Sequence, residues 1–255
     1  MNDAPAPPFS GRHFAAFLFD MDGTLITSID SANRAWTSWA LMRGFDPAYV
    51  ISIMHGVRTV ETMRRLGVQD PVAEAAWITC REIEDTEGVG SIPGALEFLN
   101  NVPADRWAIV TSASRALAEA RLSRAGIDIP SVLVASEDVE QGKPDPACFL
   151  LGAERLNAPI AHCLVFEDTV AGLSAADASG ATGLAITFTH HHPIGTGHAE
   201  IRDYRGMAVA PNAAGLALVT APIDTVGSIL YPVRRTGMAV DDALIRGQSA
   251  GRRRS

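Results

Sequence analysis

The chain has 255 residues, of which 47% are hydrophobic and 20% are charged, and its formal net charge is −8. This composition is typical of a globular protein and excludes collagen, a coiled coil and wholesale disorder. The acidic balance disfavours binding to nucleic acid or to an anionic membrane, because no positive field attracts their phosphates. No apolar run is long enough to cross a bilayer and no secretion signal is visible, so we expect a cytoplasmic protein.

The predicted elements begin with a short apolar run at 14–19, which we interpret as a buried strand. Residues from about 31 to 87 keep helical spacing throughout, and a break at 88–94 follows them. Strands then alternate with helices, which is typical of a parallel sheet with helices on both faces. The expected strands are 107–110, 132–135, 162–166 and 182–187, and the helices are 114–125, 146–156 and 170–179.

This order predicts an α/β fold into which an all-helical domain is inserted after the first strand. The polar segment 188–206 is expected to be a loop. Within the insertion, Trp36 and Trp39 are interpreted as part of its core, and the acidic group of Glu82, Glu84, Asp85 and Glu87 as a solvated face. We assign 13–28 and 92–230 to the catalytic core, 29–91 to the helical cap, and 1–12 and 231–255 to tails.

Polar side chains follow the expected strands at the points where the strands end. Because the carboxyl ends of parallel strands meet at one edge of a sheet, we expect these side chains to share a pocket. One of them, Lys143, is the only lysine in the chain. The set comprises Asp20 and Asp22 after the first strand, Thr111 and Ser112 after the second, Lys143 beyond the third, and Glu167 and Asp168 after the fourth.

These groups suit phosphoryl transfer. A carboxylate such as Asp20 can attack phosphorus and form an aspartyl-phosphate. Asp22, two residues further on, can protonate the leaving oxygen and later accept a proton from the attacking water. Thr111 and Lys143 would hold the phosphoryl oxygens as charge develops on them.

Several carboxylates in one pocket would repel a phosphate unless a cation lies between them. Mg²⁺ fits, because hard oxygen ligands and substrate phosphate are its usual coordination shell. We expect Asp20 and Asp168 to supply side-chain ligands and Asp22 its backbone carbonyl. Glu167 would bind the ion directly or through water.

Four segments together resemble the motifs of the haloacid dehalogenase superfamily: 19–25 (FDMDGTL), 110–112 (VTS), 142–146 (GKPDP) and 166–172 (FEDTVAG). The resemblance extends over about residues 14 to 187. It implies a Rossmann-like core, a helical cap inserted after the first motif, and Mg²⁺-dependent phosphatase chemistry. By this resemblance Asp20 is the nucleophile, Asp22 the acid and base, Thr111 and Lys143 phosphate ligands, and Asp168 a metal ligand.

The resemblance also narrows the activity. Dehalogenases of the superfamily lack an aspartate at the position of Asp22, and phosphonatases need a cap lysine that this chain lacks. The segments 84–88 and 92–95 look like those of sugar phosphatases, so we expect hydrolysis of a small sugar or polyol phosphate by a monomer or dimer. Alternatives are a phosphomutase resembling β-phosphoglucomutase, or a phosphatase for glycerol phosphate or phosphoglycolate. A non-catalytic protein of the same fold would need a broken motif, and none is broken.

Two histidine-containing segments leave their roles open. The loop 55–58 between cap helices is either a plain turn or a substrate contact through His55 and Arg58, with Ser112 as a further contact from the core. A guanidinium suits a sugar hydroxyl or a phosphate oxygen. The histidines at 190–192 are interpreted as a polar loop, because consecutive side chains cannot all face one ion.

Overall fold

A six-stranded parallel sheet forms the centre of the computed structural model, with strand order β5-β4-β1-β6-β7-β8. The strand order reverses at β1, which pairs with β4 on one side and β6 on the other. Ligands of such sheets bind outside the carboxyl ends of the strands at this reversal. The strands are β1 (Ala16–Phe19), β4 (Trp107–Val110), β5 (Leu133–Val134), β6 (Cys163–Glu167), β7 (Thr182–Ile186) and β8 (Ala199–Ile201).

Alternating side chains of β1 feed two hydrophobic cores. Phe17 and Phe19 point into one core, while Ala16 and Leu18 point into the other. Burial of each Phe side chain contributes about 1.5–3 kcal/mol, which stabilises the packing of helices on that face of the sheet. The phenylalanine face packs against α5 (Ala95–Asn100) and α6 (Arg115–Ala125), and the opposite face against α7 (Ala147–Arg155) and α8 (Val170–Ser179).

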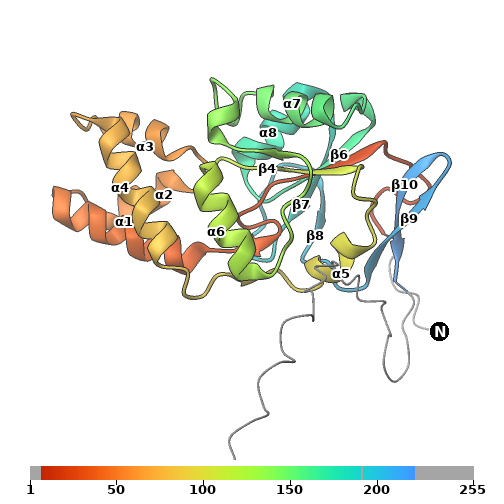
Figure 1. Ribbon diagram of the computed structural model, residues 1–255, viewed down its shortest axis with the longest axis horizontal. Coiled ribbons are helices and arrows are strands. Elements are labelled where there is room, and N and C mark those ends of the chain that lie inside the picture. Colours follow the sequence, from red (N-terminus) through yellow and green to blue (C-terminus); the bar gives the residue numbers. More distant parts are fainter. Residues whose placement is uncertain (1–6, 191, 222–255) are drawn as a thin grey trace, which may run out of the picture. The chain divides into compact units, whose positions relative to one another are not determined.

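The helical cap lies between two short strands, β2 (Ile26–Thr27) and β3 (Gly90–Ser91), which pair antiparallel. Figure 1 shows its four helices as one group beside the sheet. Trp36 and Trp39 are buried in the cap's own core, as predicted, and the Trp39 indole donates a hydrogen bond to Glu74 at 2.6 Å. The helices are α1 (Ile29–Arg43), α2 (Pro47–Met54), α3 (Thr59–Arg65) and α4 (Pro71–Glu84).

Side-chain caps stabilise the N-termini of the helices around the site. Asp70 precedes the Pro at the start of α4, and its carboxylate accepts a hydrogen bond from the Ala73 N–H. Ser114 and Thr169 cap α6 and α8 in the same way. Each cap satisfies a backbone donor that the first turn leaves unpaired, which is worth about 1 kcal/mol.

The predicted α/β fold with an inserted helical cap is confirmed, but the segment 188–206 is not only a loop. It contains β8, which extends the sheet beyond β7. With three residues and a polar surrounding sequence, this edge strand carries too little hydrophobic pattern to be recognised. An antiparallel hairpin, β9 (Met207–Asn212) and β10 (Gly215–Thr220), follows it and was not predicted.

The structure describes residues 7–190 and 192–221. The predicted tail at 231–255, the last part of the predicted core and His191 lie outside these residues, and the predicted domain boundaries stay predictions. Among the helices of the described segments, none combines the length and the apolar character needed to cross a membrane.

Candidate active site

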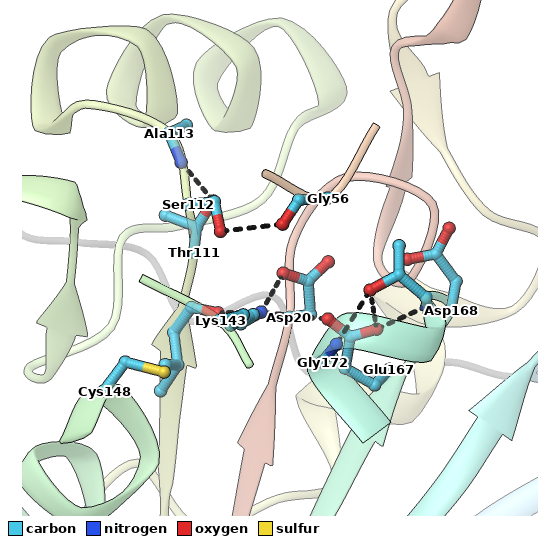
Figure 2. A network of polar contacts seen from close by, with 12 residues as sticks. Asp20, Gly56, Thr111, Ser112, Ala113, Lys143, Cys148, Glu167, Asp168 and Gly172 are labelled. Atoms are coloured by element: carbon cyan, nitrogen blue, oxygen red, sulfur yellow. Dashed lines mark hydrogen bonds and ion pairs between the residues drawn. The ribbon is translucent and has the colours of Figure 1, made fainter. Parts of the chain in front are cut away.

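A buried cluster of three carboxylates and one lysine lies where β1 and β6 end. Lys143 Nζ donates hydrogen bonds to Asp20 Oδ1 at 2.6 Å, to Glu167 Oε1 at 2.9 Å and to the Val110 carbonyl at 3.1 Å. Figure 2 shows the lysine reaching between the two carboxylates. We call Asp20, Lys143, Glu167 and Asp168 the carboxylate–lysine cluster, and none of them is more than 7% exposed.

The charges in this cluster depend on one another. Burial raises the pKa of Asp20 well above its usual value, and the Lys143 ammonium opposes that shift. Burial alone would lower the pKa of Lys143, but Asp20 and Glu167 more than offset it and raise the pKa. The lysine therefore stays charged, and it partly neutralises the negative charge of the surrounding carboxylates.

The cluster also fits a divalent cation. Asp20, Glu167 and Asp168 can each offer a carboxylate oxygen, and these oxygens lie within 4.8 Å of one another. Asp168 Oδ1 is buried and has no hydrogen-bond partner among the described residues. Burial raises the pKa of Asp168 to about 6, which a bound cation would reverse. A divalent cation such as Mg²⁺ is bound by carboxylate oxygens, and the Asp168 oxygen has a lone pair available for it.

Gly23 allows this approach of the loop after β1 to Asp168. Its φ is +84°, and a Cβ at this position would overlap the Asp168 carboxylate. Any other residue would therefore push the carboxylate out of place as well as strain the turn.

Thr111 and Ser112 face the same pocket from the end of β4. The Thr111 hydroxyl oxygen accepts a hydrogen bond from the Ala113 N–H at 3.1 Å, just ahead of α6. The Ser112 hydroxyl donates to the Gly56 carbonyl of the cap at 3.1 Å (Figure 2). Gly56 itself has a φ of +73° and lies so close to Thr169 that a Cβ would overlap it. The cap loop thus lies directly against the core beside the cluster.

A cavity of about 410 Å³ lies between this cluster and the cap. Ligand pockets of proteins typically measure about 300–1,000 Å³, so the volume suits a small phosphate ester. Asp20, Thr111 and Asp168 line it from the core, and Trp36 and His55 line it from the cap. The structure therefore brings His55, predicted as a substrate contact, to the cavity.

Arg58 does not line the cavity. Its guanidinium donates hydrogen bonds to the Val139 carbonyl at 2.9 Å and the Ser136 carbonyl at 3.3 Å, and it forms an ion pair with Glu61 at 3.0 Å. The Glu61 carboxylate in turn accepts a hydrogen bond from the Gly142 N–H at 3.2 Å. In this conformation Arg58 fastens α3 to a loop of the core, which differs from its predicted position beside the substrate.

One arginine that sequence reasoning missed connects Asp22 to the cap. Arg121 of α6 pairs with Asp22 Oδ1 at 3.0 Å and with Glu82 Oε1 of α4 at 3.1 Å. Arg121 and Glu82 are each 4% exposed, so the interpretation of Glu82 as part of a solvated face is wrong. Both were recognisable, because they continue apolar stripes at helical spacing: Leu117, Ala118, Arg121, Leu122 in α6 and Ala75, Ile78, Glu82 in α4.

His190 lies in the loop after β7 and also lines the cavity. Its Nε2 lies 3.5 Å from Asp168 Oδ2, and the Asp168 carboxylate raises the pKa of the histidine. His192 is exposed. The segment 190–192 is thus a loop as predicted over its described residues, but one member reaches the carboxylate–lysine cluster.

Fold and site together define an enzyme class: a Rossmann-like core with a helical cap over a buried carboxylate and lysine site. Residues 14–180 match the family of haloacid dehalogenase-like hydrolases. The chain belongs to this family, as its motifs predict.

Several similar proteins are named as phosphatases. The chain is 38% identical to Hexitol phosphatase A of Escherichia coli (strain K12) over 176 residues, which are 67% of this chain and 82% of the relative. It is 33% identical over 190 residues to Glycerol-1-phosphate phosphohydrolase 2 of Saccharomyces cerevisiae, covering 68% of this chain and 75% of that protein. A hydrolase from Pseudomonas syringae superposes with a TM-score of 0.63 and 26% identity, over 72% of this chain and 91% of that one. The chain is therefore an enzyme of the phosphatase type.

Proposed function

We propose that the protein is a Mg²⁺-dependent phosphatase that hydrolyses a small sugar or polyol phosphate through an aspartyl-phosphate at Asp20. The observation that carries this proposal is the ion pairing of Lys143 with Asp20 and Glu167, next to Asp168, at the cavity between core and cap. A structural ion pair would need neither the cavity nor the uncompensated negative charge.

In the first step, an Asp20 carboxylate oxygen attacks phosphorus, and the bond between phosphorus and the ester oxygen breaks. Asp22 gives its proton to the departing alkoxide, so that a neutral alcohol leaves. Lys143 and Thr111 hold the phosphoryl oxygens, and the carboxylate and hydroxyl positions need little reorganisation because neighbouring hydrogen bonds fix them.

In the second step, water attacks the phosphorus of the aspartyl-phosphate. Asp22 now accepts the proton of that water, and the bond between phosphorus and Asp20 breaks. Inorganic phosphate leaves, and Asp20 is again a carboxylate. One residue thus serves as acid and then as base, which requires its carboxyl to face both the leaving group and the incoming water.

Asp20, Asp168 and Glu167 would hold the Mg²⁺, with the backbone carbonyl of Asp22 as a further ligand. The ion would neutralise charge between phosphate and carboxylates and polarise a phosphoryl oxygen. The approach of the three carboxylates and the unpaired Asp168 oxygen support this assignment.

The leaving group is proposed to be a sugar or polyol. The names of Hexitol phosphatase A and Glycerol-1-phosphate phosphohydrolase 2 support this class. The cavity offers His55 as a polar contact and Trp36 as an apolar wall for a small hydroxylated ligand.

The test is phosphate release from a panel of sugar, polyol, nucleotide and amino-acid phosphates, each with Mg²⁺ and with EDTA. We expect metal-dependent release concentrated on hexose or polyol phosphates. Release that persists in EDTA would contradict the metal assignment. Movement of phosphate within a sugar, without release, would indicate the phosphomutase instead.

A further inference from the structure

We propose that Arg121 is a positioning residue that fixes the orientation of the Asp22 carboxylate and makes that orientation depend on Glu82 of the cap. The proposal deepens the proposed function and rests on it. Arg121 would act through Asp22, and Glu82 through Arg121.

The first observation is how the Asp22 carboxylate is held. Ser28, at the start of α1, donates to Oδ1 at 2.6 Å, and Arg121 donates to the same oxygen at 3.0 Å. Within the described part of the chain no hydrogen bond ends on Oδ2. Two charge-assisted or short bonds on one oxygen fix the side-chain torsion and leave the other oxygen available to the cavity, which Asp22 lines.

The second observation is that Arg121 depends on the cap for its own position. Its second terminal nitrogen donates to Glu82 at 3.1 Å, and both side chains are about 5% exposed. Burial raises the pKa of Glu82, while Arg121 opposes that shift. A buried guanidinium between two carboxylates is well compensated only when both are present. If the cap moves away and takes Glu82 with it, Arg121 loses one of its two anchors.

A substrate contact is the competing role, because Arg121 itself lines the cavity and its Nε has no hydrogen-bond partner among the described residues. A simple structural ion pair between α4 and α6 is the other. The three roles differ in which step and which substrate they affect, so kinetics can separate them.

The experiment compares two kinds of ester by kcat/KM, which reports the steps up to release of the alcohol. The alkyl esters are glycerol 1-phosphate and sorbitol 6-phosphate, whose leaving oxygen needs a proton. The aryl ester is 4-nitrophenyl phosphate, from which 4-nitrophenolate departs without being protonated. The variants are Arg121→Met, Arg121→Lys, Glu82→Gln and the double variant Arg121→Met with Glu82→Gln. Arg124→Met is the matched control, because Arg124 is exposed on the same helix.

We expect Arg121→Met to lower kcat/KM for the alkyl esters by about 10- to 100-fold, which is part of the rate enhancement that a general acid supplies. For 4-nitrophenyl phosphate, kcat/KM should fall by less than about threefold. Arg121→Lys should restore part of the loss, since an ammonium can still donate to Asp22. Glu82→Gln should have a smaller effect of the same kind, and none in the Arg121→Met background. Arg124→Met should behave as the wild type.

Three outcomes would overturn the inference. Equal losses on both kinds of ester would make Arg121 a structural or phosphate-binding residue. A higher KM for alkyl esters with kcat retained would make it a contact to the polyol. Additive effects of Arg121→Met and Glu82→Gln on kcat/KM would show that Arg121 does not act together with Glu82 of the cap.

Thermal melts of every variant identify any that does not fold. If Arg121→Met does not fold, Arg121→Lys, which keeps the charge, and Glu82→Gln, which keeps a hydrogen-bonding group, are compared on the two kinds of ester instead. Failure of the wild type to hydrolyse either kind of ester would instead reject the proposed function.

Discussion

The carboxylate–lysine cluster and the contacts between cap and core border the same cavity but are built differently. In the cluster, each side chain lies at the end of a strand, directly after it, or in a loop beside it, so the sheet places them together. The contacts of Arg121 and Arg58 join helices and loops that are far apart in the sequence. The first region depends on the sheet, and the second on where the cap lies. Substitutions in the two regions should therefore fail in different ways.

The largest effect is expected for Asp20→Asn. The amide is nearly the same size and still accepts a hydrogen bond from Lys143, but it cannot act as the nucleophile. We expect kcat to fall by at least about a thousandfold for every phosphate ester, because loss of a nucleophile removes the covalent route. The measurement is phosphate release under saturating substrate, with circular dichroism to show an intact fold. Full turnover by this variant would reject the aspartyl-phosphate mechanism.

Lys143→Met should lower both activity and stability. It leaves the carboxylates of Asp20 and Glu167 buried without their cation, and removing one partner of a buried ion pair costs about 3–5 kcal/mol. The free energy of unfolding in urea, measured with EDTA, gives the loss. Lys143→Arg is the control that keeps the charge.

Mg²⁺ sharpens the test of Lys143. Because a cation bound by the native state stabilises it, and the variant has one positive charge fewer beside the carboxylates, Mg²⁺ should raise the stability of Lys143→Met more than that of the wild type. A stability loss under about 1 kcal/mol in EDTA would show that the three carboxylates are not a charged cluster held by the lysine.

The same contrast separates what the sequence could predict from what it could not. Asp20, Thr111, Lys143 and Glu167 were predictable as one pocket, because each follows a recognisable strand and parallel strands share an edge. The periodicities of strands and helices also predicted most elements of the core. β8 was missed because three residues carry almost no pattern.

The cap–core contacts were not predictable for a different reason. The sequence gives helical periodicity for α4 and α6 but not the angle at which they meet. Arg121 and Glu82 were thus visible as polar residues in apolar stripes, without any indication that they face each other. Arg58 was assigned to the substrate by its residue type, whereas the position of the core loop decides what its guanidinium meets.

Arg58→Met tests the cap–core contacts directly. Arg58 contacts main-chain carbonyls and Glu61 rather than the cavity, so its loss should loosen the cap without changing the chemistry. We expect kcat/KM to fall less than about tenfold, equally for alkyl and 4-nitrophenyl esters, since remote positioning contacts affect binding and closure together. Arg64→Met is the control, because Arg64 is exposed on α3, the helix that Arg58 precedes. A rise in KM confined to alkyl esters would restore the predicted role of Arg58 as a substrate contact.

The smallest effect is expected in the loop to which Arg58 binds. Asp138 ends the turn that follows β5 and pairs with Arg115 and Arg155, at 2.8 Å in each case. It also accepts a hydrogen bond from the Ala135 N–H at 2.8 Å. Burial would raise the pKa of Asp138, but the hydrogen bonds from Arg155 and Ala135 and the charges of the two arginines together lower it below its usual value.

Folding therefore lowers the pKa of Asp138. Its carboxylate stabilises the native state at pH values above its pKa in the unfolded chain, and this stabilisation is lost as the pH falls through its pKa in the folded protein. Asp138→Asn should therefore cost about 1 kcal/mol at pH 7, given its partly exposed partners, and almost nothing near pH 2. Urea unfolding at both pH values measures this, with the exposed Asp105→Asn as control.

If the loop fixed by Asp138 is what Arg58 binds, then Asp138→Asn and Arg58→Met should lower kcat/KM less than additively. Additive losses would mean that Arg58 holds the cap through carbonyls whose position does not depend on Asp138.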